Sequence, residues 1–359
     1  MAVIEVNGLT KTFRTYRKLP GLAGAWRGLF RRETETTLAV NDISFRIEAG
    51  ELVGFVGPNG AGKTTTLKML AGLLYPTSGA ARVLGYVPWE RKDGYRRQFA
   101  LLLGQKNQLW WDLPARESLA LNAKIYGIPE PVFAATAGEL TELLGVSDKL
   151  NVMVRELSLG ERMKLELIAA LLHQPKVLFL DEPTIGLDVV SQKTVREFLQ
   201  HHNRASQTTI LLTSHYMADI QELCRRVIII DHGRLFFDGA LAEVLDRFAD
   251  FKLVTIHCAG GSAPANGPFT PSLSPSAGEG VNRREAPPLW PSADERVDLS
   301  KYGEVIECTP TTITLKVKRE RVVAVCKAVL DELPVTDLDI QEVPIEDIIR
   351  RIFAGQAGG

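Results

Sequence analysis

The feature that most tightly constrains this chain is the segment Gly-Pro-Asn-Gly-Ala-Gly-Lys-Thr-Thr at residues 57–65. It satisfies the pattern G-x-x-x-x-G-K-[ST], with an apolar run typical of a strand at 52–56 before it and helical periodicity over 64–74 after it. Glycines between a strand and a helix let backbone N–H groups point at an anion, and the helix N-terminus adds positive potential. The segment therefore predicts a phosphate-binding loop rather than an ordinary glycine-rich turn.

The side chains of this loop suit a nucleotide that carries Mg²⁺. Lys63 can reach the β- and γ-phosphates, and the hydroxyl of Thr64 can coordinate the metal ion. We therefore predict ATP and Mg²⁺ as cofactors. The loop residues expected to bind the nucleotide are Gly57, Asn59, Gly60, Ala61, Gly62, Lys63, Thr64 and Thr65.

A second candidate element is an apolar run at 177–180 that is followed by Asp181 and Glu182. A buried strand here would deliver both carboxylates to its carboxyl end, where ligands bind in parallel sheets. We expect Asp181 to hold Mg²⁺ through the water shell of the ion, and Glu182 to act as general base on the attacking water. An apolar strand ending in two acids is common by itself, and its pairing with the phosphate loop favours the catalytic interpretation.

The fold class follows from the order of apolar runs along the chain. Short runs at 177–180, 209–212 and 227–230, separated by helical stretches, indicate buried parallel strands with helices on both faces. A helical subdomain is expected at about 106–172, inserted into this α/β core. We place the whole core domain at 1–245.

The rest of the chain, 246–359, is expected to form a small α+β accessory domain. An insertion at about 259–297 interrupts it, and we predict disorder there because a stretch rich in Ala, Gly, Pro and Ser buries too little apolar area to offset its chain entropy. A second irregular segment, 17–35, mixes Arg and Lys with Leu, Trp and Phe. It is either a basic amphipathic element near a membrane or partner, or a surface hairpin or loop helix.

Composition argues against several other classes of protein. A formal net charge of −1 over 359 residues gives no global basic field for nucleic acid. Cys224, Cys258, Cys308 and Cys326 are scattered without a CxxC pair, which disfavours structural zinc and a disulfide framework and favours a reducing compartment. No apolar run approaches the roughly 20 residues of a membrane-spanning helix, and the first residues lack the pattern of a secretion signal. Any membrane role is therefore expected to come through a partner.

Further short motifs follow the phosphate loop in a fixed order. They are Leu-Ser-Leu-Gly-Glu at 157–161, Ile-Gly-Leu-Asp at 185–188 and Leu-Thr-Ser-His at 212–215. With the phosphate loop and the Asp-Glu pair, they make residues 1–245, about two thirds of the chain, resemble ABC transporter ATPase subunits. The fold that this resemblance implies is a P-loop NTPase core of ABC type with an inserted helical subdomain.

The signature motif at 157–161 departs from the LSGGQ that is usual in this family, because Leu159 replaces a glycine and Glu161 a glutamine. Ser158 and Gly160 remain. In this family they supply the hydroxyl and the backbone N–H that reach the γ-phosphate held by a facing subunit. A leucine can still offer its own N–H, provided that its φ is not required to be positive, so we expect a working site.

The resemblance also implies roles for single residues. The residues that it places in catalysis are Glu182, His215 as the switch histidine, and Gln105 as the lid glutamine. The residues that it places at the metal are Thr64, Gln105 and Asp181. Beyond the phosphate loop, the residues that it places at the nucleotide are Phe13, Ser158, Gly160 and Asp188. Phe13 resembles the aromatic residue that stacks on adenine, and Tyr16 is an open alternative.

The same resemblance implies partners. Two copies are expected to pack head to tail around ATP, each completing the other's site, and separate membrane-spanning permease subunits are expected at the cytoplasmic face of the membrane. Trp110 and Trp111 would face the coupling helix of a permease, or else belong to the core. The segments 84–92, 104–114 and 180–190 resemble the export branch for drugs, polysaccharides and lipids. An importer is the alternative, and a soluble ATPase acting on ribosomes or DNA is less favoured because there is one phosphate loop and no sustained heptad repeat.

Overall fold

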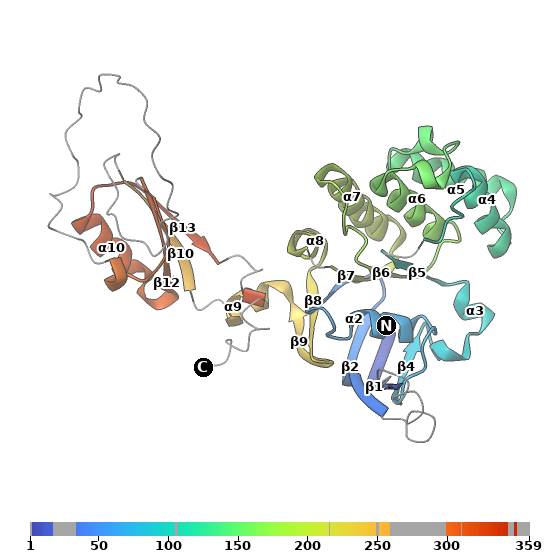
Figure 1. Ribbon diagram of the computed structural model, residues 1–359, viewed down its shortest axis with the longest axis horizontal. Helices are drawn as coiled ribbons and strands as arrows, with labels where there is room; N and C mark the ends of the chain where they lie inside the picture. The colour runs from blue at the N-terminus through green and yellow to red at the C-terminus, as the bar shows by residue number, and fades with distance from the viewer. Residues whose placement is uncertain are drawn as a thin grey trace, which may run out of the picture. The chain divides into compact units, whose positions relative to one another are not determined.

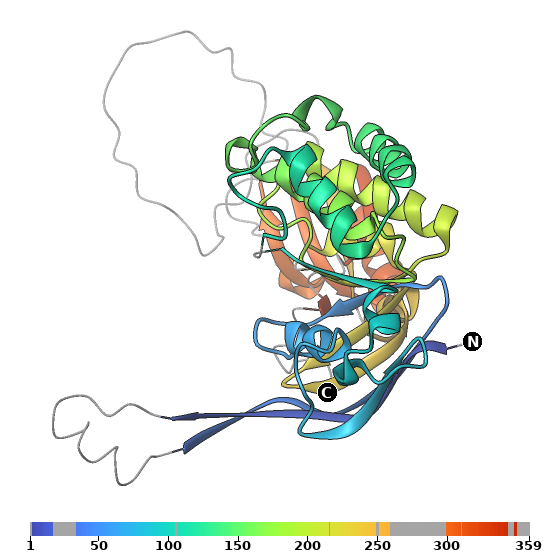
Figure 2. The same ribbon diagram turned by 90° about the vertical axis from the view of Figure 1, so that its right-hand side faces the viewer.

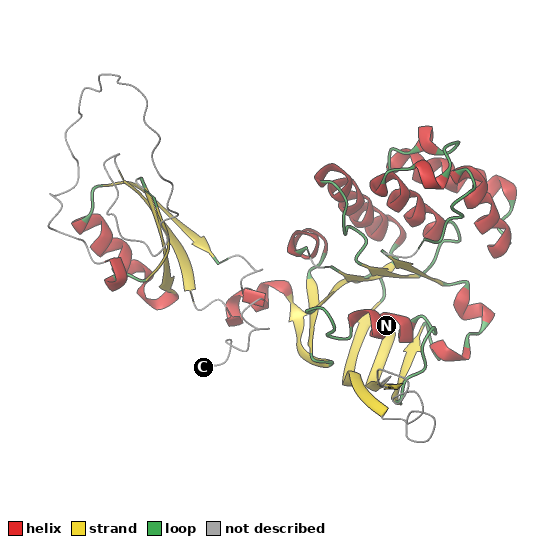
Figure 3. Ribbon diagram, in the orientation of Figure 1, coloured by secondary structure: helices red, strands yellow, loops and turns green. Residues whose placement is uncertain are grey.

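The residues that the computed structural model describes are 2–16, 34–104, 107–214, 216–248, 251–258, 299–309, 311–343 and 348–349. Gln105, His215 and the predicted insertion at 259–297 lie outside these ranges, as do residues 17–33 of the irregular segment. Contacts divide the chain into two compact units, Met1–Glu243 and Val244–Gly359. Figures 1 and 3 show the helices and strands of each unit.

A six-stranded sheet forms the centre of the first unit, in the order β5-β6-β7-β3-β8-β9. Its strands are β3 (Leu52–Val56), β5 (Phe99–Leu103), β6 (Val177–Asp181), β7 (Thr209–Thr213), β8 (Arg226–Asp231) and β9 (Arg234–Ala240). All neighbouring strands are parallel except β8 and β9. Every residue of β6 and β7 is buried, as expected for parallel strands covered on both faces. The predicted α/β fold class is confirmed.

A smaller antiparallel sheet with the order β2-β1-β4 lies against the first. Its strands are β1 (Ala2–Tyr16), β2 (Thr34–Glu48) and β4 (Ser78–Val83). Pairing between β1 and β4 ends at Thr10 and Ser78, whereas β1 and β2 stay paired out to Tyr16 and Thr34. A two-stranded ribbon therefore projects beyond the sheet (Figure 2).

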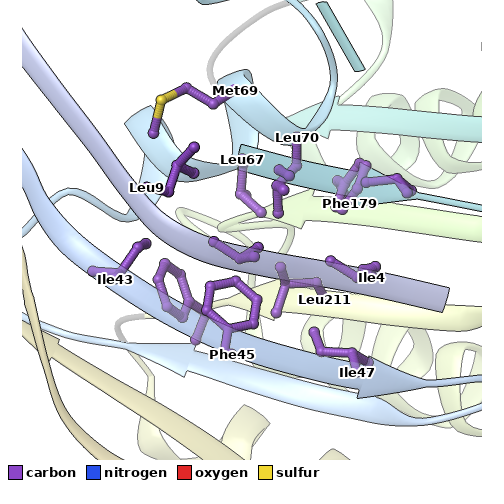
Figure 4. Close-up of a cluster of buried hydrophobic side chains, with 14 of the residues drawn as sticks. Ile4, Leu9, Ile43, Phe45, Ile47, Leu67, Met69, Leu70, Phe179 and Leu211 are labelled. Atoms are coloured by element: carbon purple, nitrogen blue, oxygen red, sulfur yellow. The ribbon is translucent and has the colours of Figure 1, made fainter. Parts of the chain in front are cut away.

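Helix α2 (Lys63–Leu70) lies between the two sheets, and this placement fixes the loop that precedes it. Its Leu67 and Leu70 join a fully buried apolar cluster with Phe45 of β2, Phe179 of β6 and Leu211 of β7 (Figure 4). Burial of each such side chain contributes roughly 1.5–3 kcal/mol. The helix that carries the phosphate loop is thus anchored by the main core.

The other helices of this unit cover the opposite face of the six-stranded sheet (Figures 1 and 2). They are α4 (Ala115–Tyr126), α5 (Glu130–Leu143), α6 (Leu159–Leu171), α7 (Val189–Ser206) and α8 (Met217–Leu223). The short helix α3 (Asp93–Arg96) precedes β5. Within the described part of the chain, no helix combines the length and the apolar character needed to cross a membrane.

The second unit is a four-stranded antiparallel sheet with one helix on a face. The strands are β10 (Phe251–Cys258), β11 (Glu304–Cys308), β12 (Thr312–Lys318) and β13 (Val335–Glu342), in the order β11-β12-β10-β13. Helix α10 (Val322–Glu332) packs Val325 and Val329 onto Val254, Ile256 and Leu315 of the sheet. Helix α9 (Leu241–Phe248) precedes β10. The prediction of a small α+β accessory module agrees with this arrangement.

Candidate active site

The carboxyl ends of four parallel strands meet at one edge of the central sheet. Because β7 lies between β3 and β6, the loop after β3, the acids at the end of β6 and the loop after β7 come together. The end of β5 lies beside β6, with Leu103 in register with Asp181. This edge is where open α/β sheets bind their ligands.

The phosphate loop needs glycine at three positions, for two different reasons. A Cβ added to Gly57 would lie 2.2 Å from the carbonyl oxygen of Ile230, and one added to Gly62 would lie 2.4 Å from that of Ala39. Gly62 also has a φ of 107° and Gly60 a φ of 82°, both in the region that favours glycine. No heavy atom lies within 4 Å of the Cβ position of Gly60. The loop is thus closely packed at Gly57 and Gly62 and open at Gly60.

Lys63 bends back over this loop. Its ammonium nitrogen donates to the carbonyl oxygens of Gly57 at 2.5 Å and Pro58 at 3.1 Å, and the residue is 5% exposed. Burial lowers the pKa of Lys63, and the charges of Glu182 and Asp181 oppose that effect. A buried cation in a loop of backbone N–H groups fits a phosphate anion.

Thr64 and Asp181, predicted together at the metal, are in direct contact. The Thr64 hydroxyl donates to the Asp181 carboxylate at 2.8 and 3.1 Å, and the Thr213 hydroxyl donates to the same carboxylate at 2.7 Å. Hydroxyl and carboxylate oxygens are the donors that Mg²⁺ prefers. No group of three or more His, Cys, Asp or Glu side chains in the described ranges could hold a metal by itself. An ion here would take its remaining ligands from phosphate oxygens and water.

Glu182 sits in a strained turn. Its φ is 56°, in the left-handed region that costs a residue with a side chain about 1–2 kcal/mol. Its N–H donates to the carbonyl oxygen and the hydroxyl of Thr213 at 3.0 and 3.1 Å. A Cβ on Gly104 would lie 2.5 Å from the Glu182 carbonyl oxygen, so the residue that follows β5 packs directly against the backbone of Glu182. The general-base candidate is therefore held by backbone contacts from two neighbouring strands.

The signature motif forms the start of α6. Ser158 is the N-cap, and its hydroxyl accepts from the Glu161 N–H at 3.2 Å while the Glu161 carboxylate accepts from the Ser158 N–H at 2.9 Å. This is a capping box, in which glutamate and glutamine serve equally. These hydrogen bonds and Lys149 lower the pKa of Glu161. Leu159 occupies the first helical turn without a positive φ, so neither departure from LSGGQ distorts the helix N-terminus.

The segment with Asp188 lies against this helix start. Asp188 is the N-cap of α7, with its carboxylate accepting from the Ser191 N–H at 2.9 Å and the Ser191 hydroxyl at 2.6 Å. A Cβ on Gly160 would lie 2.5 Å from the Ser191 hydroxyl oxygen. A side chain at position 160 would therefore push the Ser191 hydroxyl away from Asp188. The nucleotide role of Asp188 stays a prediction.

The remaining predicted residues lie at the borders of the described ranges. Phe13 is half-buried in β1, and the Lys11 ammonium lies 5.2 Å from its ring centroid. The side chain of Tyr16 is outside the described part, so the choice between these two aromatics stays open. Gln105 and His215 are outside it as well. The residues before them, Gly104 and Ser214, are at this same edge of the sheet, and the Gly104 N–H donates to the Asp181 carbonyl oxygen at 2.9 Å.

The predicted partner-facing tryptophans are exposed rather than part of the core. Trp110 is 39% and Trp111 45% exposed. The segment before them is anchored by Glu166 of α6, a buried carboxylate that accepts from the N–H groups of Gln108 and Leu109 at 2.8 to 3.3 Å. Burial raises the pKa of Glu166, and these two N–H donors oppose that effect. The tryptophans are therefore presented by a fixed backbone.

An open pocket of about 240 Å³ lies in this unit, next to the anchored segment. Its lining includes Leu73, Arg96, Phe99, Gln108, Asn122 and Tyr126. The lining joins the end of the α2 segment, β5 and α4, and Gln108 connects it to the residues that precede the tryptophans. The pocket therefore lies beside the segment that leads to Trp110 and Trp111 and is lined by neither of them.

Sequence reasoning missed two residues of this site, Thr213 and Glu166. Thr213 stood in the sequence only as a member of the motif at 212–215 with no role of its own, and its contact with Asp181 depends on the register of β6 against β7. In the sequence, Glu166 is a single charge within an otherwise apolar stretch at 165–172. A charged residue on the buried face of a helix is the signal that could have identified it.

Two stretches of the sequence match known protein families. Residues 40–185 match the family described as "ABC transporter", and residues 291–341 match "EvrA-like ABC transporter, C-terminal domain". The ABC transporter ATP-binding protein NatA of Bacillus subtilis (strain 168) is 37% identical over 217 residues, which are 60% of this chain and 88% of that protein.

Two further similarities concern a curated protein and a solved structure. The Nod factor export ATP-binding protein I of Burkholderia lata is 39% identical over 220 residues, covering 61% of this chain and 72% of that protein. A structure described as the ATP binding subunit of an ABC transporter has a TM-score of 0.57 and 28% sequence identity, and the match covers 68% of this chain and 93% of the other.

Proposed function

This chain belongs to the ATP-binding proteins of ABC transporters and is an ATPase of that family, and on this basis we propose that it drives export through separate permease subunits. In this proposal two copies bind ATP between them, and the chain works at the cytoplasmic face of the cell membrane, held there by the permease. The likeness to a protein named for Nod factor export supports the direction of transport. The permease contact is inferred from one observation, namely that Trp110 and Trp111 are exposed on an anchored segment beside a pocket.

The composite site is supported by where the two halves of the binding chemistry lie. The phosphate loop precedes α2 on one face of the central sheet, and Ser158 starts α6 on the other face (Figure 1). Two anion-binding helix starts on opposite faces suit two nucleotides rather than one. A twofold pair of copies would bring the loop of each to the Ser158 of the other.

We assign the residues as follows. The phosphate-loop N–H groups and Lys63 hold the β- and γ-phosphates, and Thr64 and Asp181 hold the metal ion with help from Gln105. Mg²⁺ bound with ATP would supply positive charge across the phosphate oxygens. Glu182 takes the proton of the attacking water. The other proposed contacts are those of His215 with the γ-phosphate, Phe13 with adenine, and Ser158, Gly160 and Asp188 of the facing copy with the nucleotide.

We also propose that 1–245 and 246–359 are separate domains, with the helical subdomain at about 106–172 inserted in the first. The division of contacts between Glu243 and Val244 supports this boundary. So does the separate match of residues 291–341 to a C-terminal domain family.

The permease contact predicts the behaviour of a double variant, Trp110→Ala with Trp111→Ala. We expect co-purification with the permease to be lost. Truncating a buried tryptophan at the centre of an interface typically costs about 2 kcal/mol or more of binding free energy. Basal ATP hydrolysis should stay within about twofold of wild type, since neither indole is assigned a catalytic part. The measurement is recovery of tagged permease with the ATPase, together with phosphate release by the isolated chain.

A matched control replaces two similarly exposed residues of α5, Val132 and Leu143, with alanine. That variant should retain the permease. Retention of the permease by the tryptophan variant would refute the docking surface, and a large fall in its melting temperature would assign the tryptophans to the core. The direction of transport is read separately, by mass spectrometry of cells and medium from a strain carrying Glu182→Gln. Cargo retained inside the cells supports export, and cargo left in the medium refutes it.

A further inference from the structure

A buried carboxylate outside the predicted motifs joins two of the catalytic loops. Asp219 of α8 is fully buried, and one of its oxygens accepts from the Thr184 hydroxyl at 2.5 Å and the Ser214 hydroxyl at 2.6 Å. The other oxygen accepts from Arg196 of α7 at 3.1 Å. All four residues are less than 10% exposed. A single side chain thus connects three separate segments.

The two hydroxyl groups lie next to the proposed catalytic residues in the chain. Thr184 is two residues after Glu182, and Ser214 directly precedes His215. The Ser214 hydroxyl also accepts from the Tyr216 N–H at 3.0 Å, so the backbone is fixed on both sides of position 215. The turn that carries the general-base candidate and the turn that carries the switch candidate are therefore tied to the same carboxylate.

Main-chain pairing reaches only the start of the first turn, where the Glu182 N–H donates to the Thr213 carbonyl oxygen at 3.0 Å. The parallel ladder between β6 and β7 ends at Asp181 and Thr213. Within the ladder's last pair, Thr213 contacts Asp181 and the Glu182 N–H. Asp219 adds a second connection beyond the end of the sheet. This connection joins the segment after Glu182 to the residue before His215 through side chains.

The chemistry of the cluster favours a geometric role over a purely stabilising one. A buried carboxylate and guanidinium are costly to desolvate, and a buried ion pair adds little net stability over apolar residues of similar volume. Here every charged partner is satisfied, since Arg196 also donates to Glu222 at 2.7 Å. Fully satisfied buried networks fix a unique arrangement of the groups that they join. The groups joined here are the catalytic turns and α7.

We propose that Asp219 is a positioning residue for ATP hydrolysis, which holds the turn after Glu182 and the turn before His215 at a fixed separation. It touches neither nucleotide nor the attacking water, and it acts through Thr184 and Ser214. The link to Arg196 extends this control to α7, whose N-cap is Asp188. The proposal rests on the catalytic roles proposed for Glu182 and His215.

The test measures turnover and ATP affinity separately in the purified full chain. Asp219→Ala should lower kcat by about 10- to 100-fold, the effect of a displacement near 1 Å at reacting groups. The KM for ATP and the affinity for a fluorescent ATP analogue should stay within about twofold, because among the described residues no hydrogen bond or ion pair joins the phosphate loop to the cluster. Thr184→Val and Ser214→Ala should each lower kcat less, and their double variant should fall short of the product of the two effects, since both act through one carboxylate.

The matched control is Glu222→Ala, which removes the other partner of Arg196 at a half-exposed position and leaves the two hydroxyl contacts in place. Its kcat should stay within about twofold of wild type, because the contacts of Asp219 with Thr184, Ser214 and Arg196 all remain. A variant of Asp219 with unchanged kcat would overturn the proposal, and so would equal losses in kcat and ATP affinity. If Asp219→Ala fails to fold, the kcat and ATP affinity of Thr184→Val and Ser214→Ala provide the same test.

A parallel measurement on Glu182→Gln separates this inference from the site assignment. If that variant hydrolyses ATP like wild type, the assignment of the catalytic turn is wrong and the positioning role falls with it. If Glu182→Gln is inactive while Asp219→Ala and both hydroxyl variants keep full kcat, the positioning role alone is refuted.

Discussion

Lys63→Ala should leave a folded chain with ATP hydrolysis at least about 100-fold below wild type, the scale of losing one charged donor at a reacting phosphate. The physical reason is the position of the ammonium group, which is buried in the loop and held by the carbonyl oxygens of Gly57 and Pro58. No other lysine belongs to the phosphate loop at 57–65. Phosphate release at saturating MgATP is the measurement.

Lys68→Ala provides the matched control, because it removes the same charge from the same helix α2. That variant should retain most of the wild-type turnover. Wild-type turnover by Lys63→Ala in the purified complex would refute the assignment of residues 57–65 as the phosphate site.

Glu182→Gln should bind ATP but hydrolyse it about 100-fold or more slowly, because the amide cannot take the proton of the attacking water. Since Lys63, Thr64 and Asp181 are unchanged, the nucleotide stays bound and holds two copies together. We expect a dimer in Mg-ATP by gel filtration with light scattering, and a smaller species without nucleotide. Adding Lys63→Ala to this variant should abolish the dimer, which shows that ATP itself joins the copies.

Two outcomes would contradict this account of Glu182. A monomer in Mg-ATP would count against two copies closing around the nucleotide. Turnover close to wild type would show that another group takes the proton.

The parts of the site that the sequence predicted are those set by local chain chemistry. The phosphate loop is contiguous with its flanking strand and helix, and the Asp-Glu pair is contiguous with its strand. Residue order alone is therefore enough to predict each of them. The capping box of Ser158 and Glu161 was also readable, as a serine followed three residues later by glutamate. Glu161 was instead taken only as a departure from the family pattern.

The parts that sequence reasoning missed depend on tertiary arrangement. Thr213 reaches Asp181 only because β6 and β7 are neighbours, and Asp219 reaches Thr184 only because α8 packs against β3 and α7. Strand-like alternation is clear in the sequence only over residues 2–6, whereas β1 continues to Tyr16. Gly8 has a φ of 58° and sits at a register shift between Val6 and Leu9. A glycine bulge inside a strand resembles a strand end in the sequence, although pairing continues beyond it.

The central claim is that each ATP is held by the phosphate loop of one copy and the Ser158 of another. Ser158→Asp tests it without loss of helix capping, because aspartate caps a helix as well as serine does. The added charge would repel a γ-phosphate in the facing copy. Each single variant, Lys63→Ala or Ser158→Asp, should be inactive.

Co-expression of the two variants with different tags is the most direct measurement. A mixed dimer carries both defects in one composite site and leaves the other site intact. Random pairing should therefore restore about a quarter of wild-type hydrolysis, since half of the dimers are mixed and each has one intact site of two. A purified mixed dimer that is as inactive as its parents would contradict the composite site.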